Sequence, residues 1–382
     1  MRIVIDARML SWTGIGRYTV ALLEGLESID QENEYLVLMR RNDWPRWSPS
    51  AGNFTRIECD IAPYTVAEQA RLPRLLHRLA PDVVHLVTPN AAALYGGRKV
   101  VTVADLTLLD FDTSRGSLGR RLATKLKRLP FRMIFRRQVA TATHIVTLTE
   151  YVRRQLMTRF RVEGSHVSAA WLAADSAQLT AAEEEPVAGL ADAGPFILYV
   201  GNYYGYKNVR ILVEALALLS KDRRDVRLVL AGEPGEFKQA LLSLAENLQV
   251  SDLVVMPGFV TDGQLKWLYR NAAMYVNPSL SEGFGLQGLE AMTQGLPVLS
   301  STASCLPEVY GDAAVYFDPH DAGELAQNIA DLLEQPGRSI ELAAMGHDRL
   351  AMFSWQKTAE LTHQVYTDAG HQVSRDDQKR RA

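Results

Sequence analysis

The sequence has few cysteines and no long hydrophobic run. Its 382 residues include two cysteines, Cys59 and Cys305, which lie far apart in the chain. Two cysteines are too few for a disulfide scaffold, and we expect both thiols to be reduced in the cytoplasm. No run of about 18 apolar residues occurs, so no transmembrane helix is predicted. Three apolar residues separate Arg2 from Asp6, which is too short a segment for a secretory signal.

The composition is that of an ordinary globular protein. Hydrophobic residues make up 47% of the chain and charged residues 22%, with 26 glycines and 16 prolines. These values exclude disordered and collagen-like chains, and the length predicts two to three domains. The net charge of -3 divides into +8 over residues 1–176 and -11 over residues 177–382. A basic half joined to an acidic half indicates two domains, one of which faces an anionic partner.

Short β-branched apolar segments alternate with helix-like segments, and the pattern occurs twice. Such segments are typical of parallel sheets that are buried on both faces, which predicts an α/β protein with two doubly wound domains. Ligands of these folds bind at the carboxyl ends of the strands, so we expect the site in a cleft between the domains. The predicted strands are residues 2–6, 34–39, 82–87, 99–105 and 144–149, then 196–201, 226–232, 253–259, 273–278, 297–301 and 314–317.

A turn in the second half carries the strongest chemical signal. A strand ends near Asn277, a glycine-rich turn contains Glu282, and a helix begins near Leu286 with Glu290 one turn further on. Glycines let the backbone approach a ligand, and the helix start favours a phosphate. A carboxylate repels phosphate, so the glutamates suit sugar hydroxyls, and the combination predicts a nucleotide-sugar site. A glycine-rich turn with two solvated glutamates is the alternative that the spacing alone leaves open.

The same turn resembles the signature of family 4 of the retaining glycosyltransferases, in which two Rossmann-like domains of the GT-B fold face a central cleft. Glu282 precedes Gly-Phe-Gly, and Glu290 follows after seven residues. IDARML, TGIGRY, GQLKWLYRNAAMYVNPSLSEGFGL, GLPVLSS, LPEVYGDAAVYFDP and FSWQKTAE also resemble family segments. The pattern is most similar to bacterial GDP-mannose-dependent mannosyltransferases of surface-polysaccharide synthesis. It implies an acceptor domain at 1–176, a linker at 177–194, a donor domain at 195–354 and a helix at 355–382 that packs back on the first domain.

The resemblance implies donor-binding roles in the second half. Glu290 would hold the ribose, Glu282 would contact the transferred sugar, and Lys207 would stabilise the departing diphosphate. Taken alone, a lysine such as Lys207 is more commonly an exposed loop residue. Asn202 and Tyr206 lie around the position where the family usually supplies an arginine, and Asn202 is an expected donor contact. The other expected donor contacts in this half are Gly258, Phe259, Val260, Gly283, Phe284, Gly285 and Leu286.

The glycines of TGIGR could be mistaken for a dinucleotide fingerprint. Eight residues separate the first strand from Gly14, and no third glycine follows Gly16 at the required spacing, which disfavours an oxidoreductase. The resemblance implies instead that Gly14 and Gly16 lie near the donor diphosphate. Arg17 is a further phosphate contact, with a capping or salt-bridge role as the alternative.

Ala104 is the main departure from the family pattern. Related mannosyltransferases have His-Asp where this chain has Ala104 and Asp105, and the family histidine lies beside the reacting carbon. The backbone carbonyl of Ala104 would do part of that work, or His85 would approach the site, although a histidine after a strand is more often structural. Asp105 would orient the acceptor or the donor sugar. A pseudo-enzyme that only binds a nucleotide-sugar is the remaining hypothesis.

No metal is expected, because the resemblance implies a metal-independent enzyme. Asp110 and Asp112 have the spacing of a metal-binding pair in another glycosyltransferase fold, but such pairs also occur by chance.

Residues 113–137 contain nine basic residues and no acidic residue. Leucines at helical spacing share one face, which predicts a basic amphipathic helix on anionic lipid. A solvated helix that packs on its own domain is equally open, whereas nucleic acid is disfavoured by the acidic second half. The expected membrane contacts are Arg120, Arg121, Lys125, Lys127 and Arg128.

These patterns together predict a retaining hexosyltransferase that takes mannose from GDP-mannose to a lipid-linked or saccharide acceptor in bacterial polysaccharide, lipopolysaccharide or O-antigen assembly. We expect a cytoplasmic protein at the inner face of the plasma membrane. The alternatives are a UDP- or dTDP-sugar donor, the pseudo-enzyme, and a sugar-nucleotide epimerase.

Overall fold

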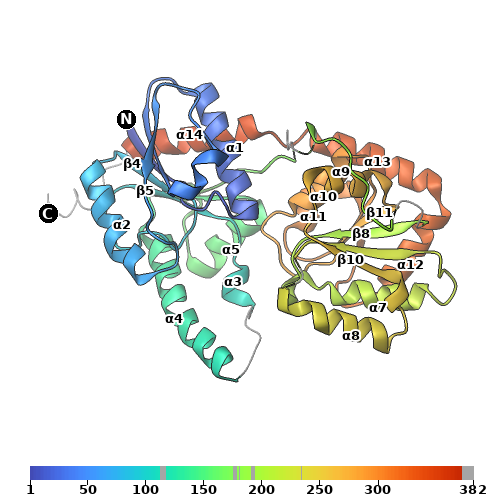
Figure 1. Cartoon of the computed structure of the whole chain (residues 1–382). Helices are drawn as coiled ribbons and strands as arrows, with labels where there is room; N and C mark the ends of the chain where they lie inside the picture. Colours follow the sequence, from blue (N-terminus) through green and yellow to red (C-terminus); the bar gives the residue numbers. More distant parts are fainter. Residues whose placement is uncertain (112–117, 175–178, 180, 191–193, 234, 372–382) are drawn as a thin grey trace. The chain divides into compact units, whose positions relative to one another are not determined.

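The chain divides into two compact units, Met1–Leu172 with the segment from Ser354 onward, and Ala173–Phe353 (Figure 1). The computed structural model describes the chain except residues 112–117, 175–178, 180, 191–193, 234 and 372–382, and except the side chains of residues 13, 118–128 and 236. Each unit contains one parallel sheet, so the predicted α/β class with two Rossmann-like parallel-sheet domains is confirmed.

The sheet of the first unit has the strand order β3-β2-β1-β4-β5-β6-β7. Its central strands β4 and β5 are buried along their whole length, as expected for strands covered on both faces. The strands are β1 (Arg2–Asp6), β2 (Glu34–Met39), β3 (Phe54–Glu58), β4 (Val83–Leu86), β5 (Lys99–Val103), β6 (His144–Thr147) and β7 (Val167–Ala169). The helices are α1 (Thr13–Ile29), α2 (Val66–Leu79), α3 (Thr107–Asp110), α4 (Leu118–Thr141), α5 (Glu150–Phe160) and α14 (Trp355–His371), with 3-10 turns η1 (Arg41–Arg46) and η2 (Gly164–His166).

Helix α14 belongs to the first unit, although it comes last in the described chain. It lies alongside α1 (Figure 1), where a Cβ atom on Gly25 would come within 2.7 Å of the Ala359 Cβ. Tyr366 of α14 also hydrogen bonds to Nδ1 of His85 on β4 at 2.6 Å. The Nε2 atom of His85 bonds to Thr102 on β5 at 2.7 Å. Close helix packing and this buried chain of polar groups therefore fix α14 to the sheet.

The sheet of the second unit has the strand order β10-β9-β8-β11-β12-β13. Its strands are β8 (Phe196–Val200), β9 (Arg227–Ala231), β10 (Val254–Gly258), β11 (Met274–Asn277), β12 (Val298–Ser301) and β13 (Ala314–Phe317). Its helices are α7 (Arg210–Leu219), α8 (Lys238–Asn247), α9 (Asp262–Asn271), α10 (Leu286–Thr293), α11 (Leu306–Tyr310), α12 (Ala322–Glu334) and α13 (Pro336–Leu350), with 3-10 turns η3 (Gly205–Lys207), η4 (Gly235–Phe237), η5 (Ser251–Leu253) and η6 (Gly311–Ala313).

Two glutamates in the segment of the chain that follows β7 and precedes β8 contact α9. Glu184 pairs with Arg270, and Glu185 accepts hydrogen bonds from Thr261 at 3.0 Å and Gln264 at 3.1 Å. Part of the predicted linker at 177–194 lies outside the described residues, and these contacts place its acidic stretch on the second unit.

Candidate functional site

The glycine-rich turn joins β11 to α10, and a buried tyrosine shapes it. Gly285 is the residue before α10 and has a φ of +91°, a conformation that side chains with a Cβ rarely adopt. The Tyr310 hydroxyl donates to the Gly285 carbonyl at 2.6 Å and accepts from the Asn277 amide at 3.1 Å. A Cβ on Gly285 would lie 2.6 Å from that hydroxyl, and one on Gly288 would also collide with Tyr310. Both glycines are therefore required by packing against Tyr310.

Lys207 and Glu282 were predicted separately, and the structure brings them together. The Lys207 Nζ lies 2.6 Å from the Glu282 Oε1, and the two side chains are 14% and 11% exposed. The Ser279 hydroxyl donates to the same carboxylate oxygen at 2.7 Å, and the Glu282 backbone N–H donates to Ser304 at 3.0 Å. A cation, a carboxylate and a helix N-terminus thus occupy one small region, which suits a ligand that carries both phosphate and hydroxyl groups.

The backbone around Lys207 is fixed to the same turn. Asn208 has a φ of +54°, and its amide donates to the carbonyls of Pro278 at 3.2 Å and Pro319 at 2.8 Å. The Leu280 N–H donates to the Tyr206 carbonyl at 2.7 Å. These bonds hold the lysine turn against the glutamate turn independently of the ion pair.

Glu290 lies one turn into α10 and is buried. The hydroxyl of Tyr269, a buried residue of α9, donates to its Oε2 at 3.1 Å. The two glutamates of the motif thus have different surroundings, since Glu282 pairs with a cation and Glu290 accepts from a neutral hydroxyl.

Three neighbouring strands of the second unit end in glycines with positive φ. Gly201 follows β8, Gly232 follows β9 and Gly258 ends β10, with φ values of +149°, +128° and +80°. The Gly232 N–H donates to the Gly258 carbonyl at 2.8 Å, and a Cβ on Gly232 would collide with the Gly201 carbonyl. The backbone at this edge of the sheet is therefore tightly packed. The predicted donor residues Asn202 and Phe259 follow these glycines and have exposed side chains, and Val260 is half-buried.

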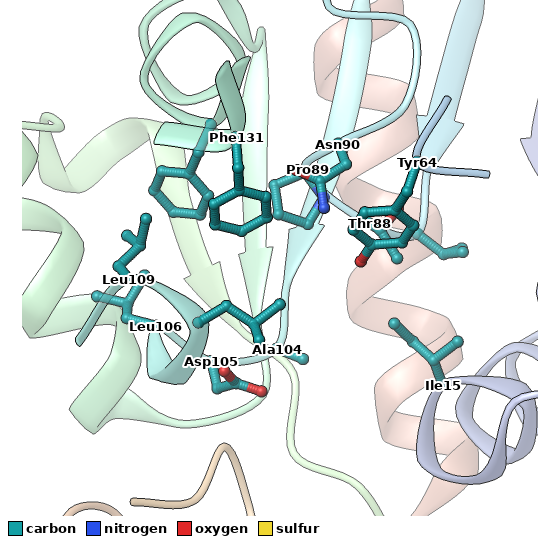
Figure 2. A pocket seen from close by; sticks show the side chains of 13 residues that line it. Ile15, Tyr64, Thr88, Pro89, Asn90, Ala104, Asp105, Leu106, Leu109 and Phe131 are labelled. Carbon is teal, nitrogen blue, oxygen red and sulfur yellow. The ribbon is translucent and has the colours of Figure 1, made fainter. Parts of the chain in front are cut away.

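A second region of interest is a pocket in the first unit, at the carboxyl ends of β4 and β5 (Figure 2). It encloses about 440 Å³, part of it open to solvent. Ala104 and Asp105 both line it, and Asp105 accepts a hydrogen bond from the Thr107 N–H at 2.7 Å. Ala104 is therefore at a pocket wall. The lining residues are Ile15, Tyr64, Val87, Thr88, Pro89, Asn90, Ala104, Asp105, Leu106, Leu108, Leu109, Phe131 and Phe135.

His85 lies in the core of the first unit. Its side chain is fully buried between Tyr366 and Thr102, and burial lowers its pKa to about 3. This arrangement fits the structural alternative for His85. It does not line the pocket that contains Ala104.

The glycines of TGIGR lie in the first turn of α1. Gly16 is buried, and a Cβ there would collide with the Leu10 carbonyl, whereas Gly14 is exposed with open space around it. Arg17 is exposed on the same helix. Gly16 therefore has a packing role that is independent of any ligand.

Asp110 forms an ion pair with Arg159 on the surface of the first unit. Both of its oxygens accept from the Arg159 guanidinium, at 2.7 and 2.6 Å, while Asp112 lies outside the described residues. Within the described residues, no group of three or more His, Cys, Asp or Glu side chains is placed to hold a metal ion.

The predicted membrane helix corresponds to α4. The side chains of Arg120, Arg121, Lys125, Lys127 and Arg128 lie outside the described part of the structure. Among the helices that are described, none combines the length and the apolar character needed to cross a bilayer.

The sequence did not single out several polar groups that support these sites. Ser279, Ser304, Tyr269 and Tyr310 contact the glutamate turn, but serines and tyrosines are too common for their positions to carry a signal. Asn90 lines the pocket of the first unit, and a single asparagine in a loop after a strand carries no signal in the sequence.

Two family models match successive parts of the chain. The model described as Glycosyltransferase Family 4 matches residues 12–171, and the model described as Glycosyl transferases group 1 matches residues 181–347. O-antigen chain mannosyltransferase B of Escherichia coli is 32% identical over 59% of this chain and 61% of its own length. The serotype-specific mannosyltransferase WbdA of the same species is 35% identical over 45% of this chain and 22% of its own length. The alignments thus span less than two thirds of these relatives.

Solved structures extend the likeness over nearly the whole chain. Sucrose-phosphate synthase from Thermosynechococcus elongatus superposes with a TM-score of 0.73 at 20% identity, covering 96% of this chain and 98% of that one. Anabaena HepE in complex with UDP and glucose gives a TM-score of 0.71 at 15% identity, covering 96% and 100%. These likenesses concern the fold. The two family models and the shared fold place the chain in the GT-B glycosyltransferases, as a Glycosyltransferase Family 4 domain followed by a Glycosyl transferases group 1 domain.

Proposed function

We propose that the protein is a retaining hexosyltransferase that moves mannose from GDP-mannose to a lipid-linked or saccharide acceptor in bacterial polysaccharide assembly. The observation that carries the proposal is the Lys207–Glu282 pair beside the N-terminus of α10. Mannose is supported by the two relatives described above, both of which are named as mannosyltransferases. The resemblance to GDP-mannose-dependent enzymes supports the guanine nucleotide.

In the proposed reaction the second unit holds the donor. Lys207 and the N–H groups at the start of α10 neutralise the diphosphate, and Glu290 accepts hydrogen bonds from the ribose. Glu282 accepts from a hydroxyl of the transferred sugar. The Gly285 carbonyl accepts a hydrogen bond from Tyr310, which fixes the backbone of the turn that precedes α10. Fixed donors of this kind stabilise charge that develops on the leaving group.

The bond changes follow from this arrangement. The bond between the sugar C1 and the diphosphate oxygen breaks, and the acceptor oxygen bonds to C1 on the same face, which retains the configuration. The acceptor proton passes to the leaving diphosphate, whose charge Lys207 stabilises. Asp105, in the pocket of the first unit, orients the acceptor. No histidine side chain is required at position 104 in this route.

We propose that the acceptor enters the pocket beside Ala104 and Asp105 and that α4 contacts anionic lipid at the inner face of the plasma membrane. The nine basic residues at 113–137 support the membrane contact. A pseudo-enzyme is the second candidate, because Ala104 replaces the histidine that the resembled family uses.

Thermal unfolding with a panel of nucleotides tests the proposal. A ligand that binds only the folded state raises the melting temperature. We expect GDP and GDP-mannose to raise it, UDP-glucose and dTDP to raise it less, and NAD to leave it unchanged. Stabilisation by UDP compounds alone would show that the donor is a UDP-sugar and not GDP-mannose. Stabilisation by no nucleotide would overturn the proposal.

Substitution of Glu290 tests the ribose role. Glu290→Gln keeps the size of the side chain and removes its charge. The affinity for GDP should therefore fall about tenfold or more, and the rise in melting temperature with GDP should become smaller. Glu341→Gln, at an exposed site on α13, is the matched control.

An activity assay separates the transferase from the alternatives. A transferase should release GDP only when an acceptor is present. A pseudo-enzyme would bind the donor and release no GDP, and an epimerase would convert the donor without an acceptor.

A further inference from the structure

The pocket of the first unit contains a buried amide that the protein does not use. Asn90 is 4% exposed, and among the residues that the structure describes neither its Nδ2 nor its Oδ1 has a hydrogen-bond partner. Burial raises the pKa of Tyr64 and the nearby Asn90 amide lowers it, so the Tyr64 hydroxyl lies close to this amide. An unsatisfied buried amide is destabilising, because it has lost its hydrogen bonds to water and gained none in the protein. A ligand that binds in the pocket could supply the hydrogen bonds that this amide lacks.

The backbone around Asn90 is held without help from its side chain. The Gln69 Nε2 donates to the Asn90 carbonyl at 2.6 Å, and the Gln69 Oε1 accepts from the Ala93 N–H at 2.9 Å. Gln138 of α4 donates to the Ala91 carbonyl. The loop after β4 is thus anchored from two helices, and the Asn90 amide is carried into the pocket by a fixed backbone.

The chemistry of the pocket limits what can pair with this amide. In Figure 2 the Asn90 side chain lies between those of Phe131 and Tyr64, and most of the wall is apolar. A primary amide offers one donor and one acceptor side by side, which matches two neighbouring hydroxyl groups of a sugar. The apolar C–H face of the sugar suits the ring of Phe131. A carboxylate or phosphate would lose its hydration there and would meet the charge of Asp105.

An aromatic surface continues from the pocket toward solvent. Tyr64 stacks on Trp12 with ring centres 5.5 Å apart and planes 11° from parallel, and both are nearly half exposed. The Tyr64 N–H donates to Glu68 at 2.9 Å, and Glu68 pairs with the buried Arg8 at 2.6 Å. A buried ion pair therefore fixes this pair of rings at the edge of the pocket, where a second sugar can lie flat on them.

We propose that Asn90 determines acceptor specificity by binding two neighbouring hydroxyls of an uncharged sugar, with the next sugar of the acceptor on Tyr64 and Trp12. This inference rests on the proposed function, because it names the acceptor of that reaction. The lipid portion of a lipid-linked acceptor is excluded from the pocket, since an isoprenoid has no group for the Asn90 amide.

The test compares full-length variants in binding and in stability. Binding of methyl α-mannoside, methyl mannobioside, methyl glucoside, methyl glucuronide and farnesyl phosphate is measured by ligand-observed NMR titration. We expect the uncharged glycosides to bind, the disaccharide more tightly, and the glucuronide and farnesyl phosphate to bind at least tenfold more weakly. Tight binding of farnesyl phosphate without glycoside binding would make this a lipid pocket and overturn the inference.

Asn90→Leu removes both hydrogen-bonding atoms at nearly constant size. Glycoside affinity should fall at least tenfold, while the melting temperature is equal or higher because no protein partner is lost. Asn90→Ser, which keeps one hydroxyl, should lose less affinity. Asn247→Leu, at an exposed site in the second unit, is the control and should change neither quantity. Unchanged glycoside binding in Asn90→Leu, or a fall in its melting temperature of several degrees, would overturn the inference.

Nucleotide stabilisation separates this inference from the proposed function. It is measured in the same samples and depends on the second unit. If GDP stabilises the protein and no glycoside binds, the specificity role fails and the donor site stands. If no nucleotide stabilises the protein and glycosides bind through Asn90, the transferase proposal fails and the sugar site stands.

Discussion

Lys207 combines two tasks at the scale of a single residue, because it neutralises Glu282 and faces the proposed diphosphate. Lys207→Met should remove the partner of a carboxylate that is only 11% exposed and lower the free energy of unfolding by about 1–3 kcal/mol. It should also abolish most of the stabilisation by GDP. Urea unfolding with and without GDP measures both effects. Arg210→Met is the matched control, because its pair with Glu214 is exposed and contributes little. Equal losses in the two variants would contradict the assignment.

Gly285 is required by backbone geometry as well as by packing. Gly285→Ala places a Cβ on a residue with a φ of +91° and 2.6 Å from the Tyr310 hydroxyl, so we expect a loss of about 2–4 kcal/mol. Gly337→Ala, in α13 with open space around it, should be neutral or stabilising by about 0.5–1 kcal/mol. Urea unfolding of the two variants measures the difference. A Gly285→Ala protein as stable as the Gly337→Ala protein would show that the turn relaxes freely.

At the scale of elements, the sequence predicted the strands that contain a continuous apolar run and omitted two short strands that do not. The eleven predicted segments correspond to β1, β2, β4–β6 and β8–β13. The strands β3 and β7 were missed, because each is partly exposed at an edge of the sheet and lacks a continuous apolar run. The motif residues were predictable for a related reason, since glycines and paired glutamates stand out in a sequence. Asn90 did not stand out, because its significance depends on what surrounds it in space.

The contact between α14 and β4 predicts a response of stability to acid. Burial lowers the pKa of His85 to about 3 in the folded state, whereas the unfolded chain has the ordinary value near 6.5. Below about pH 6.5 the unfolded state therefore binds a proton that the folded state excludes, and stability falls as the pH falls toward 3, by about 1.4 kcal/mol per unit. His85→Gln should be less stable at pH 7 and should show a shallower loss between pH 6 and 4.

Urea unfolding at several pH values measures these slopes. His320→Gln is the control, because its side chain is exposed and should leave the slope unchanged. His144 is also buried, and burial lowers its pKa to about 4, so part of the acid response should remain in His85→Gln. Identical slopes in the parent and in His85→Gln would show that His85 is protonated without opening the core around α14.

At the scale of the whole molecule, charge is segregated along the chain, with a net of +8 over residues 1–176 and -11 over residues 177–382. A uniformly anionic protein would be repelled by an anionic membrane, whereas the net positive charge of the first half of this chain supports the proposed membrane contact. The attraction should weaken with salt, because exposed charges are screened beyond about 10 Å at 0.1 M ionic strength. The proposal assigns this attraction to the basic stretch at 113–137, which contains nine basic residues and no acidic residue.

Sedimentation with anionic phospholipid vesicles tests this distribution. The parent should pellet with the vesicles at low salt and be released at about 0.5 M salt, where screening is nearly complete. One variant replaces four basic residues of α4 by glutamine, namely Arg120, Arg121, Lys125 and Arg128, and should bind at least tenfold more weakly. The control makes the same change of net charge in the second unit, at Arg210, Lys221, Arg224 and Arg338, and should bind like the parent. If both variants lose binding equally, net charge and not the basic helix governs the association, and the contact assigned to α4 is wrong.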